Sequence, residues 1–317
     1  MREIAFALIA LAMSTAAPTP ATAERPQERR AEATSLLGTP LYSGTPSPEA
    51  LANLETARAE LETSPKDADA IIWVGRRLGY LQRFREAIDM FSRGIELHRT
   101  DARLYRHRGH RYLSVREFDK AIQDLTKASQ LVAGKPDVIE PDGQPNARNI
   151  PTSTLNSNIY YHLGLGYYFK GDFANALNAF QQCATFSKNS DMTVATSHWL
   201  YMILRRLGRA AEAQKVLEPI SAGMDIIENG SYHKLLLMYK GEEKPEALLS
   251  SARSKGLDAV TVGYGVGNWH LYNGRQDRAM KIFTEIVENN QTQWPAFGYI
   301  AAETEIARAR KMGARSR

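Results

Sequence analysis

Apolar and small residues recur along this chain at a helical spacing, and the pattern itself repeats with a period of 34 residues between positions 68 and 135. The matching positions are Gly75 and Gly109, Ala87 and Ala121, and Gly94 and Ala128. A fixed period of this length is typical of stacked helix pairs, because a single pair cannot bury its own apolar face. The pattern therefore predicts an all-α array in which neighbouring pairs cover one another.

The same pattern predicts where the helices lie. A first capping helix is predicted over 47–66, because Ser47 is a good N-cap and Pro48 suits the first helical position. The pattern predicts two helix pairs over 68–135 and four further pairs over 157–293. A capping helix with a basic tail is predicted over 294–317. Six pairs with a helix at each end are enough to build a continuous core.

The residue types at the recurring positions are specific. In the first repeat they are Ile71, Val74, Gly75, Leu78, Ala87, Phe91 and Gly94. In the third, at 157–190, they are Tyr160, Leu163, Gly164, Tyr167, Gly171, Ala176, Phe180 and Cys183. This pattern resembles the tetratricopeptide repeat family. The resemblance covers about 68–293 and implies a right-handed α-solenoid of antiparallel helix pairs, a superhelix of the tetratricopeptide repeat type.

A long insertion separates the second and third repeats, at 136–156. Connections between helices usually have a few residues, so an insertion of roughly twenty is unusual. Its Pro-Asp-Gly and Gln-Pro-Asn sequences form turns, which predicts an ordered loop. The candidate residues in it are Glu140, Asp142 and Asn146. They are expected either to cap turns and pair with a neighbouring arginine, or to form a lid or a partner contact.

The N-terminal segment has the features of an export signal. Residues 4–17 are apolar apart from one serine and one threonine, and small residues follow at 21–23. This stretch is too short to span a bilayer, so a cleaved signal peptide is predicted over 1–23. The alternatives are a short disordered leader or an uncleaved anchor. The segment 24–46 is rich in Pro, Arg, Glu and Thr and is predicted to be a disordered linker. The chain is therefore expected to be periplasmic or secreted.

Composition changes this interpretation little. The 40 Lys and Arg residues are mixed with 35 Asp and Glu residues, and a net charge of +5 does not by itself favour any class of partner. The single cysteine, Cys183, cannot form an internal disulfide. Because it occupies a small-residue packing position, it is expected to be a buried, inert thiol.

In the family that the chain resembles, the first helix of each repeat lines a concave groove. Here that face is basic and aromatic, and its candidate partner-binding residues are Arg76, Tyr80, Arg103, Arg106, His110, Asn158, Tyr161, His162, Trp199, Arg205 and Arg206. Such a lining suits an acidic peptide, a carboxylate terminus or an anionic glycan. The alternative is a solvated basic face without a ligand. The chaperone-binding clamp of some family members is not carried over, because Ile72, Arg76 and His107 replace its Lys and Asn.

Other classes of function lack their motifs. The chain has no nucleophile elbow, phosphate loop or dinucleotide fingerprint, so neither a catalytic residue nor a cofactor is predicted. His107 and His110 lie three residues apart and His162 could approach them, but zinc needs three or four ligands in tetrahedral geometry. No metal site is therefore predicted. Nucleic acid is disfavoured by the export signal and by the absence of a recognised motif.

These observations predict a non-catalytic adaptor or assembly scaffold outside the cytoplasm, with a protein or peptide partner in the groove. The alternative is a small-ligand binder, for an anionic sugar or a metal, that uses the Arg and His residues of the groove and the 136–151 loop. A hydrolase that uses Glu140 and Asp142 is a distant third. The sequence specifies no oligomeric state.

Overall fold

The computed structural model describes residues 30–252 and 256–315, and the described residues from Ala31 onward form one compact unit. The signal peptide predicted over 1–23 lies outside the described residues. The described residues form fourteen α-helices, one short 3-10 helix and one pair of two-residue strands, so the predicted all-α class is confirmed. None of these helices combines the length and the apolar character needed to cross a membrane.

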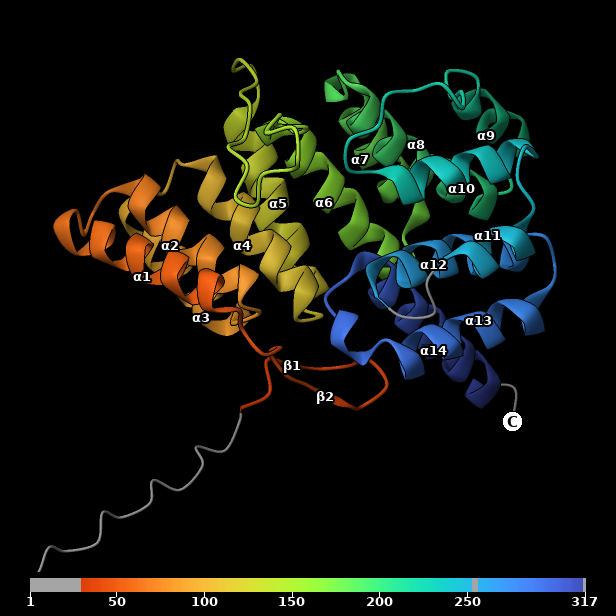
Figure 1. The fold of residues 1–317 in the computed structure, drawn as a ribbon, viewed down its shortest axis with the longest axis horizontal. Helices are drawn as coiled ribbons and strands as arrows, with labels where there is room; N and C mark the ends of the chain where they lie inside the picture. The colour runs from red at the N-terminus through yellow and green to blue at the C-terminus, as the bar shows by residue number, and fades with distance from the viewer. Residues whose placement is uncertain (1–29, 253–255, 316–317) are drawn as a thin grey trace, which may run out of the picture. The chain divides into compact units, whose positions relative to one another are not determined.

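The helices follow one another in antiparallel pairs, six of which run from α2 to α13 (Figure 1). The elements of the first half are α1 (Pro48–Thr63), α2 (Ala68–Tyr80), α3 (Phe84–Leu97), α4 (Ala102–Ser114), α5 (Phe118–Val132), α6 (Leu155–Lys170) and α7 (Phe173–Phe186). Those of the second half are α8 (Ser190–Arg206), α9 (Ala210–Leu217), α10 (Gly230–Lys240), α11 (Pro245–Ser251), α12 (Leu257–Tyr272), α13 (Gln276–Asn289), η1 (Gln291–Gln293) and α14 (Phe297–Arg315).

Small residues let the two helices of a pair approach closely, as the pattern predicted. A Cβ atom added at Gly164 would lie 2.5 Å from the ring of Phe180, and one at Gly109 would lie 2.7 Å from Leu125. Glycine at these positions therefore brings α6 onto α7 and α4 onto α5. The predicted start of the first helix is also confirmed, because the Ser47 hydroxyl accepts a hydrogen bond from the backbone nitrogen of Ala50 at 3.1 Å.

The turn inside each pair needs a left-handed backbone. Glycine supplies it after α6, α8, α10 and α12, as Gly171, Gly208, Gly241 and Gly274, all with φ between 75° and 88°. In the first two pairs the corresponding residues are Gln82 and Arg116, with φ of 57° and 66°. A non-glycine residue in this region is strained, so its side chain is expected to make a compensating contact.

For Gln82 this contact is made with the N-terminal segment, part of which was predicted to be a disordered linker. Its described part instead forms an antiparallel hairpin of β1 (Ala33–Thr34) and β2 (Pro40–Leu41). Gln82 accepts a hydrogen bond from the backbone nitrogen of Gly44 at 2.9 Å. The apolar residues Ala33 and Leu41 of the hairpin are buried. Because most residues around them are polar, the composition of the segment did not indicate this short motif. The linker prediction is therefore wrong for residues 30–46.

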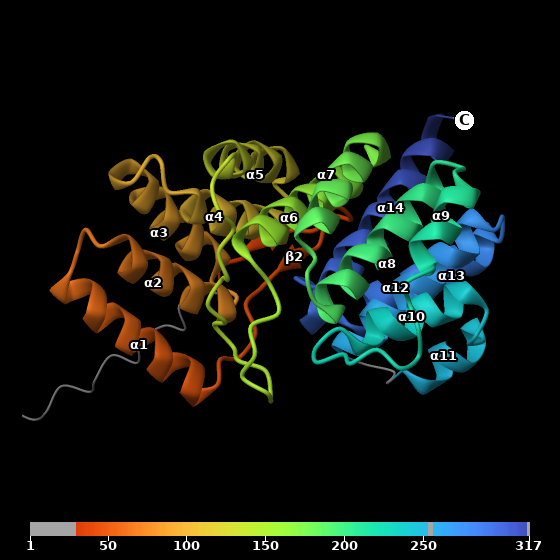
Figure 2. The same ribbon diagram turned by 90° about the horizontal axis from the view of Figure 1, so that it is seen from above.

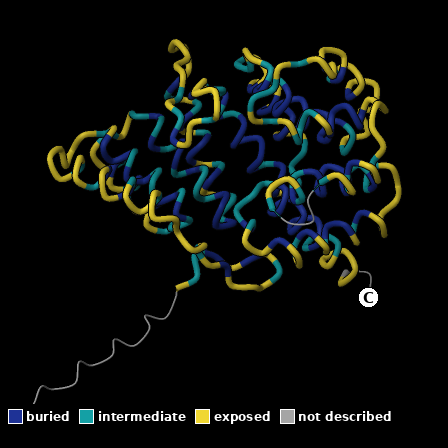
Figure 3. The backbone as a smooth tube through the Cα atoms, viewed as in Figure 1, coloured by how far each residue is buried: buried dark blue, intermediate teal, exposed yellow. Residues whose placement is uncertain are grey.

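The last helix does not simply extend the array. α14 packs against α12 and α13 and also reaches back to α6, and Figure 2 shows it beside α8 and α12. Arg308 on α14 donates hydrogen bonds to the carbonyl oxygens of Tyr168 and Phe169, each at 2.9 Å, so the basic tail is anchored at its start. The helices α6, α8 and α12 are consequently covered on several sides and form the interior (Figure 3).

A buried ion pair joins the turn between α4 and α5 to the last helix. Arg116 donates to the carboxylate of Glu303 on α14 at 2.7 Å, and both side chains are almost fully buried. Glu303 also accepts a hydrogen bond from the backbone nitrogen of Leu36 in the hairpin. The indole nitrogen of Trp294 donates to the carbonyl oxygen of Tyr42 at 2.8 Å. These contacts, which we call the terminal clasp, hold the hairpin, α4–α5 turn and last helix together.

Candidate functional site

The insertion between α5 and α6 is an ordered loop that folds back onto the first two helix pairs. Its two arms pair through a bridge between Ile139 and Thr154, with a 3.2 Å hydrogen bond from the Glu140 nitrogen to the Ser153 carbonyl. At its tip the Asn146 side chain accepts hydrogen bonds from the next turn and donates to Glu228 at 2.7 Å. The loop is thus held at both its base and its tip.

Two arginines of α2 hold the middle of the loop. Arg76 donates to the carbonyl oxygen of Pro141 at 2.7 Å, and Arg77 donates to that of Gly143 at 2.9 Å. Gly143 lies so close to the hydroxyl of Tyr80 that an added Cβ atom would overlap it. Any side chain at this position would push the loop away from α2.

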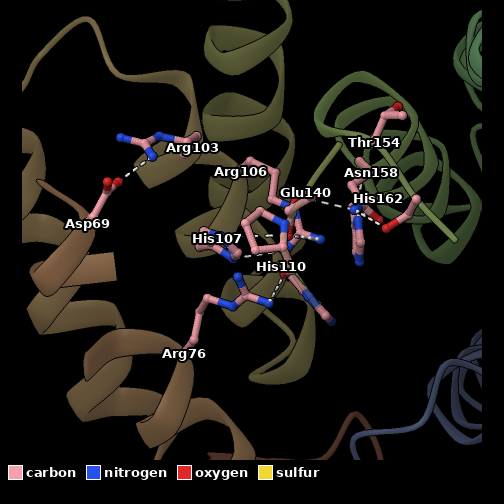
Figure 4. A network of polar contacts seen from close by, with 12 residues as sticks. Asp69, Arg76, Arg103, Arg106, His107, His110, Glu140, Thr154, Asn158 and His162 are labelled. Atoms are coloured by element: carbon pink, nitrogen blue, oxygen red, sulfur yellow. Dashed lines mark hydrogen bonds and ion pairs between the residues drawn. The ribbon is translucent and has the colours of Figure 1, made fainter. Parts of the chain in front are cut away.

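Glu140 is the main polar contact between the loop and α4 (Figure 4). Its carboxylate lies 3.0 Å from Arg106 and 3.8 Å from the Nε2 atom of His107, and it accepts a hydrogen bond from Asn158 at 3.2 Å. The Glu140 and Arg106 side chains are only 10% and 9% exposed. The expected pairing of a loop carboxylate with a neighbouring arginine is therefore made by Glu140.

Beneath the loop lies a cavity of about 190 Å³. Its polar lining comes from α2, α4, α6, the loop and the segment before α10, and includes Arg76, Tyr80, Arg106, His107, His110, Arg111, Glu140, Asp142, Asn158 and Glu228. Five of these residues were predicted from the sequence as part of a groove: Arg76, Tyr80, Arg106, His110 and Asn158. The fold brings them together around one cavity beneath the loop and not along a continuous groove.

Burial makes the histidines here neutral. The pKa values of His107, His110 and His162 are all held well below the usual range, first by burial and then by the positive charge of Arg106 or Arg111. The rings of His110 and His162 lie 4.1 Å apart, and both pack against Phe297 of α14. No group of three His, Cys, Asp or Glu side chains that could hold a metal ion occurs among residues 30–252 and 256–315.

The same burial acts on the arginines. The pKa of Arg106 is lowered by burial, an effect that Glu140 partly opposes. Burial and the charge of Arg106 also lower the pKa of Arg111 to about 10. Arg111 was missed by the sequence reasoning, although it lies four positions after His107 and therefore on the same helical face. Phe297 was missed as well, and nothing in the local sequence pattern connects it with α4 or α6.

The rest of the predicted groove is not an accessible surface. Trp199 is 1% exposed, and its indole nitrogen donates to the hydroxyl of Tyr161 at 2.7 Å. Arg206 pairs with the buried carboxylate of Glu305 at 2.8 Å, and Arg205 donates to Asn273 at 3.0 Å. The physical reason is that α12 and α14 pack on this face. The prediction of one continuous groove over four repeats is corrected accordingly.

Arg103 and Cys183, which the sequence analysis also singled out, lie outside the cavity. Arg103 points away from the cavity and pairs with Asp69 and Asp101, the latter at 2.6 Å (Figure 4). Cys183 is fully buried, as predicted, and contacts the Thr196 hydroxyl at 3.3 Å. Burial raises the pKa of its thiol to about 11, so the thiol stays protonated at neutral pH.

Comparison with known proteins identifies one repeat directly. The model of the tetratricopeptide repeat matches residues 157–190, the same bounds that the sequence pattern gave to the third repeat, so the predicted resemblance is confirmed there. No curated protein matches the chain.

The solved structures that are similar include YrrB, described as a TPR protein with an unusual peptide-binding site. It shares 15% identity over 74% of this chain and 92% of its own, with a TM-score of 0.42. A tetratricopeptide repeat protein from Parabacteroides merdae shares 12% identity over 81% of this chain and 93% of its own, with a TM-score of 0.47. MamA shares 16% identity over 60% of this chain and 90% of its own, with a TM-score of 0.40.

Proposed function

We propose that this chain is a non-catalytic adaptor that binds a protein or peptide partner at a cleft between α2, α4 and the inserted loop. The tetratricopeptide repeat at 157–190 supports a protein-interaction role in general. The observation that carries the proposal is the exposure of two large apolar residues at the base of the loop. Ile139 is 67% exposed and Val138 is 50% exposed, and both line this cleft.

The cleft has the chemistry of a peptide site. Its volume is about 270 Å³, and its apolar lining is completed by Ile72, Trp73 and Leu155. The guanidinium group of Arg76 lies over the Trp73 ring, 4.4 Å from its centroid. An extended segment with an apolar side chain and a neighbouring acidic residue fits this combination of surface and charge. Export to the periplasm or the medium is part of the proposal and rests on the sequence of residues 1–23.

Paired variants in the loop test this surface. Ile139→Ser removes apolar area from the cleft, whereas Ile150→Ser removes a similarly exposed side chain from the same loop that does not line the cleft. The purified chain and both variants are crosslinked to host envelope extract, and bound proteins are identified by mass spectrometry. We expect at least one protein to be retained by the wild type and Ile150→Ser but lost by Ile139→Ser. Identical sets of bound proteins for all three would contradict the proposal.

A further inference from the structure

We propose that the cavity beneath the loop binds a small oxyanion that carries at least two carboxylate or phosphate oxygen atoms. The cavity and the apolar cleft would bind different ligands, although they share the wall formed by Arg76, Glu140 and Pro141. The proposal rests on three features of the cavity: cations without an acidic partner, an unpaired buried donor, and a size that suits a small molecule.

The cavity is lined by arginines, two of which lack an acidic partner among residues 30–252 and 256–315. Arg76, Arg106 and Arg111 line the cavity from two adjacent helices, α2 and α4. Within the described part of the chain, Arg76 and Arg111 form no ion pair with a carboxylate. Arg111 instead contacts the Nδ1 atom of His110 at 2.6 Å, and its guanidinium lies 5.3 Å from the centroid of the Phe84 ring. Taking an arginine out of water without a counter-charge is costly, and an anion in the cavity would offset that cost.

A single buried donor points to the same ligand chemistry. The Arg106 side chain is nine-tenths buried, and two of its nitrogen atoms are engaged: Nη1 with the Nδ1 atom of His107 at 2.9 Å and Nη2 with Glu140 at 3.0 Å. Its Nε atom has no hydrogen-bond partner. A guanidinium group presents its N–H donors in a planar fork that matches carboxylate and phosphate oxygens. This unpaired N–H adds to the positive potential of the cavity wall, which favours an oxyanion there.

Two of the three carboxylates at the boundary of the cavity have partners already. Glu140 is held by Arg106 and Asn158. Glu228 accepts hydrogen bonds from Asn146 and from the Thr152 hydroxyl, at 2.7 and 2.8 Å. Asp142 is the third carboxylate and is half-buried. The imidazoles of the cavity are neutral and carry no positive charge. Arg76 and Arg111 are therefore the cations that an anionic ligand would contact.

Size narrows the ligand. The cavity of about 190 Å³ is large enough to hold several water molecules. Inorganic phosphate or a short dicarboxylate fits this space. The loop covers the site, and its carbonyl contacts to Arg76 and Arg77 fix it over the cavity. The structure thus favours a small anion beneath the loop.

The test uses two probes and a charge-matched control. The purified chain is titrated with inorganic phosphate and with succinate by calorimetry, and its melting temperature is followed at constant ionic strength. We expect one probe to bind saturably and to raise the melting temperature with the logarithm of its concentration. Saturation by phosphate alone assigns a phosphate site, and saturation by succinate alone assigns a dicarboxylate site. If neither probe binds, the proposal is overturned.

Variants of α4 place the binding. Arg111→Gln removes a cavity cation, and we expect it to weaken binding by roughly tenfold or more. Arg111→Lys keeps the charge and guards against loss of folding, and it should weaken binding less. Arg103→Gln makes the same change of charge on the same helix outside the cavity, so binding should be unchanged. Equal weakening by Arg103→Gln and Arg111→Gln would overturn the site. Ile139→Ser should leave anion binding intact, which separates this proposal from the protein-binding cleft.

Discussion

The indole nitrogen of Trp199 on α8 donates a hydrogen bond to the hydroxyl of Tyr161 on α6, at 2.7 Å, in a region where both side chains are buried. Each residue lies on the helical face that would be open to a partner in an unfilled groove. Here that face carries the aromatic interior of the protein, in which the Trp199 ring also stacks against Phe180, with centroids 6.2 Å apart. The cavity and the cleft described above are instead formed by α2, α4, the start of α6 and the loop.

The Tyr161–Trp199 pair predicts a clear loss of stability. Tyr161→Phe keeps the ring but removes the acceptor that lies 2.7 Å from the buried indole nitrogen of Trp199, so we expect the free energy of unfolding to fall by about 1–3 kcal/mol. Urea denaturation measures the change. Tyr160→Phe is the control, because its half-exposed ring stacks on Phe186 and the described structure gives its hydroxyl no hydrogen bond. Equal losses for the two variants would show that the hydrogen bond does not matter.

The terminal clasp predicts coupling between distant positions. Arg116→Met or Glu303→Leu alone leaves an unpaired buried charge, and each is expected to lower the free energy of unfolding by about 3–5 kcal/mol. The double variant should be more stable than the sum of the two losses implies. Methionine keeps a side chain at the same positive φ, so backbone strain is not altered. Additive losses in the double-mutant cycle would contradict the pairing.

The contact between Glu140 and Arg106 predicts how the loop is held. Glu140→Gln removes the charge that balances Arg106, and we expect the loop to open locally and the free energy of unfolding to fall by about 3 kcal/mol. Trypsin cleavage after the exposed Arg148 near the loop tip reports the opening and should become faster. Asp142→Asn changes the same charge without removing an ion pair. Cleavage at the same rate in all three proteins would refute this role of Glu140.

Buried histidines predict sensitivity to acid. Burial lowers the pKa of His198 to about 3, below the value of about 6.5 in an unfolded chain. The unfolded state therefore binds a proton more readily, and stability is lost as the pH falls below about 6.5. His198→Phe should preserve the stacking on Tyr232 and reduce the slope of unfolding free energy against pH by about 1.4 kcal/mol per pH unit, between about pH 5 and pH 6. A slope equal to that of the wild type would disprove the assignment.

Local features of the fold could be predicted from the sequence. Gly164 and Phe180 carry the packing of the third repeat within one short segment, and the predicted bounds of that repeat match the family model. Glu140 could be predicted as a site residue because its carboxylate lies between two turn sequences and near an arginine-rich helix. Such a carboxylate is expected to form an ion pair with an arginine. These predictions succeed because the interacting residues lie near one another in the sequence or follow the period of the repeat.

The closure of the array could not be predicted in this way. Arg116 and Glu303 are 187 positions apart, and neither belongs to a motif that marks it as a contact. The prediction for Trp199 and Tyr161 was wrong about accessibility because it assumed that the concave side stays open. Helix α8 is buried on nearly every side, and its aromatic residues serve equally well as a binding surface or as a core. The packing of α10 and α12 on α8 decides between these two outcomes.

The terminal clasp also restricts how this protein can change in evolution. An open array of repeats can gain or lose a whole unit, because each unit contacts only its neighbours. Here Glu303 has to reach both Arg116 and the backbone of Leu36, 267 positions earlier in the chain. Duplication or deletion of a helix pair between them would move α14 off its partners. The number of repeats is therefore fixed by geometry, and diversity has to enter through insertions such as the loop over the cavity.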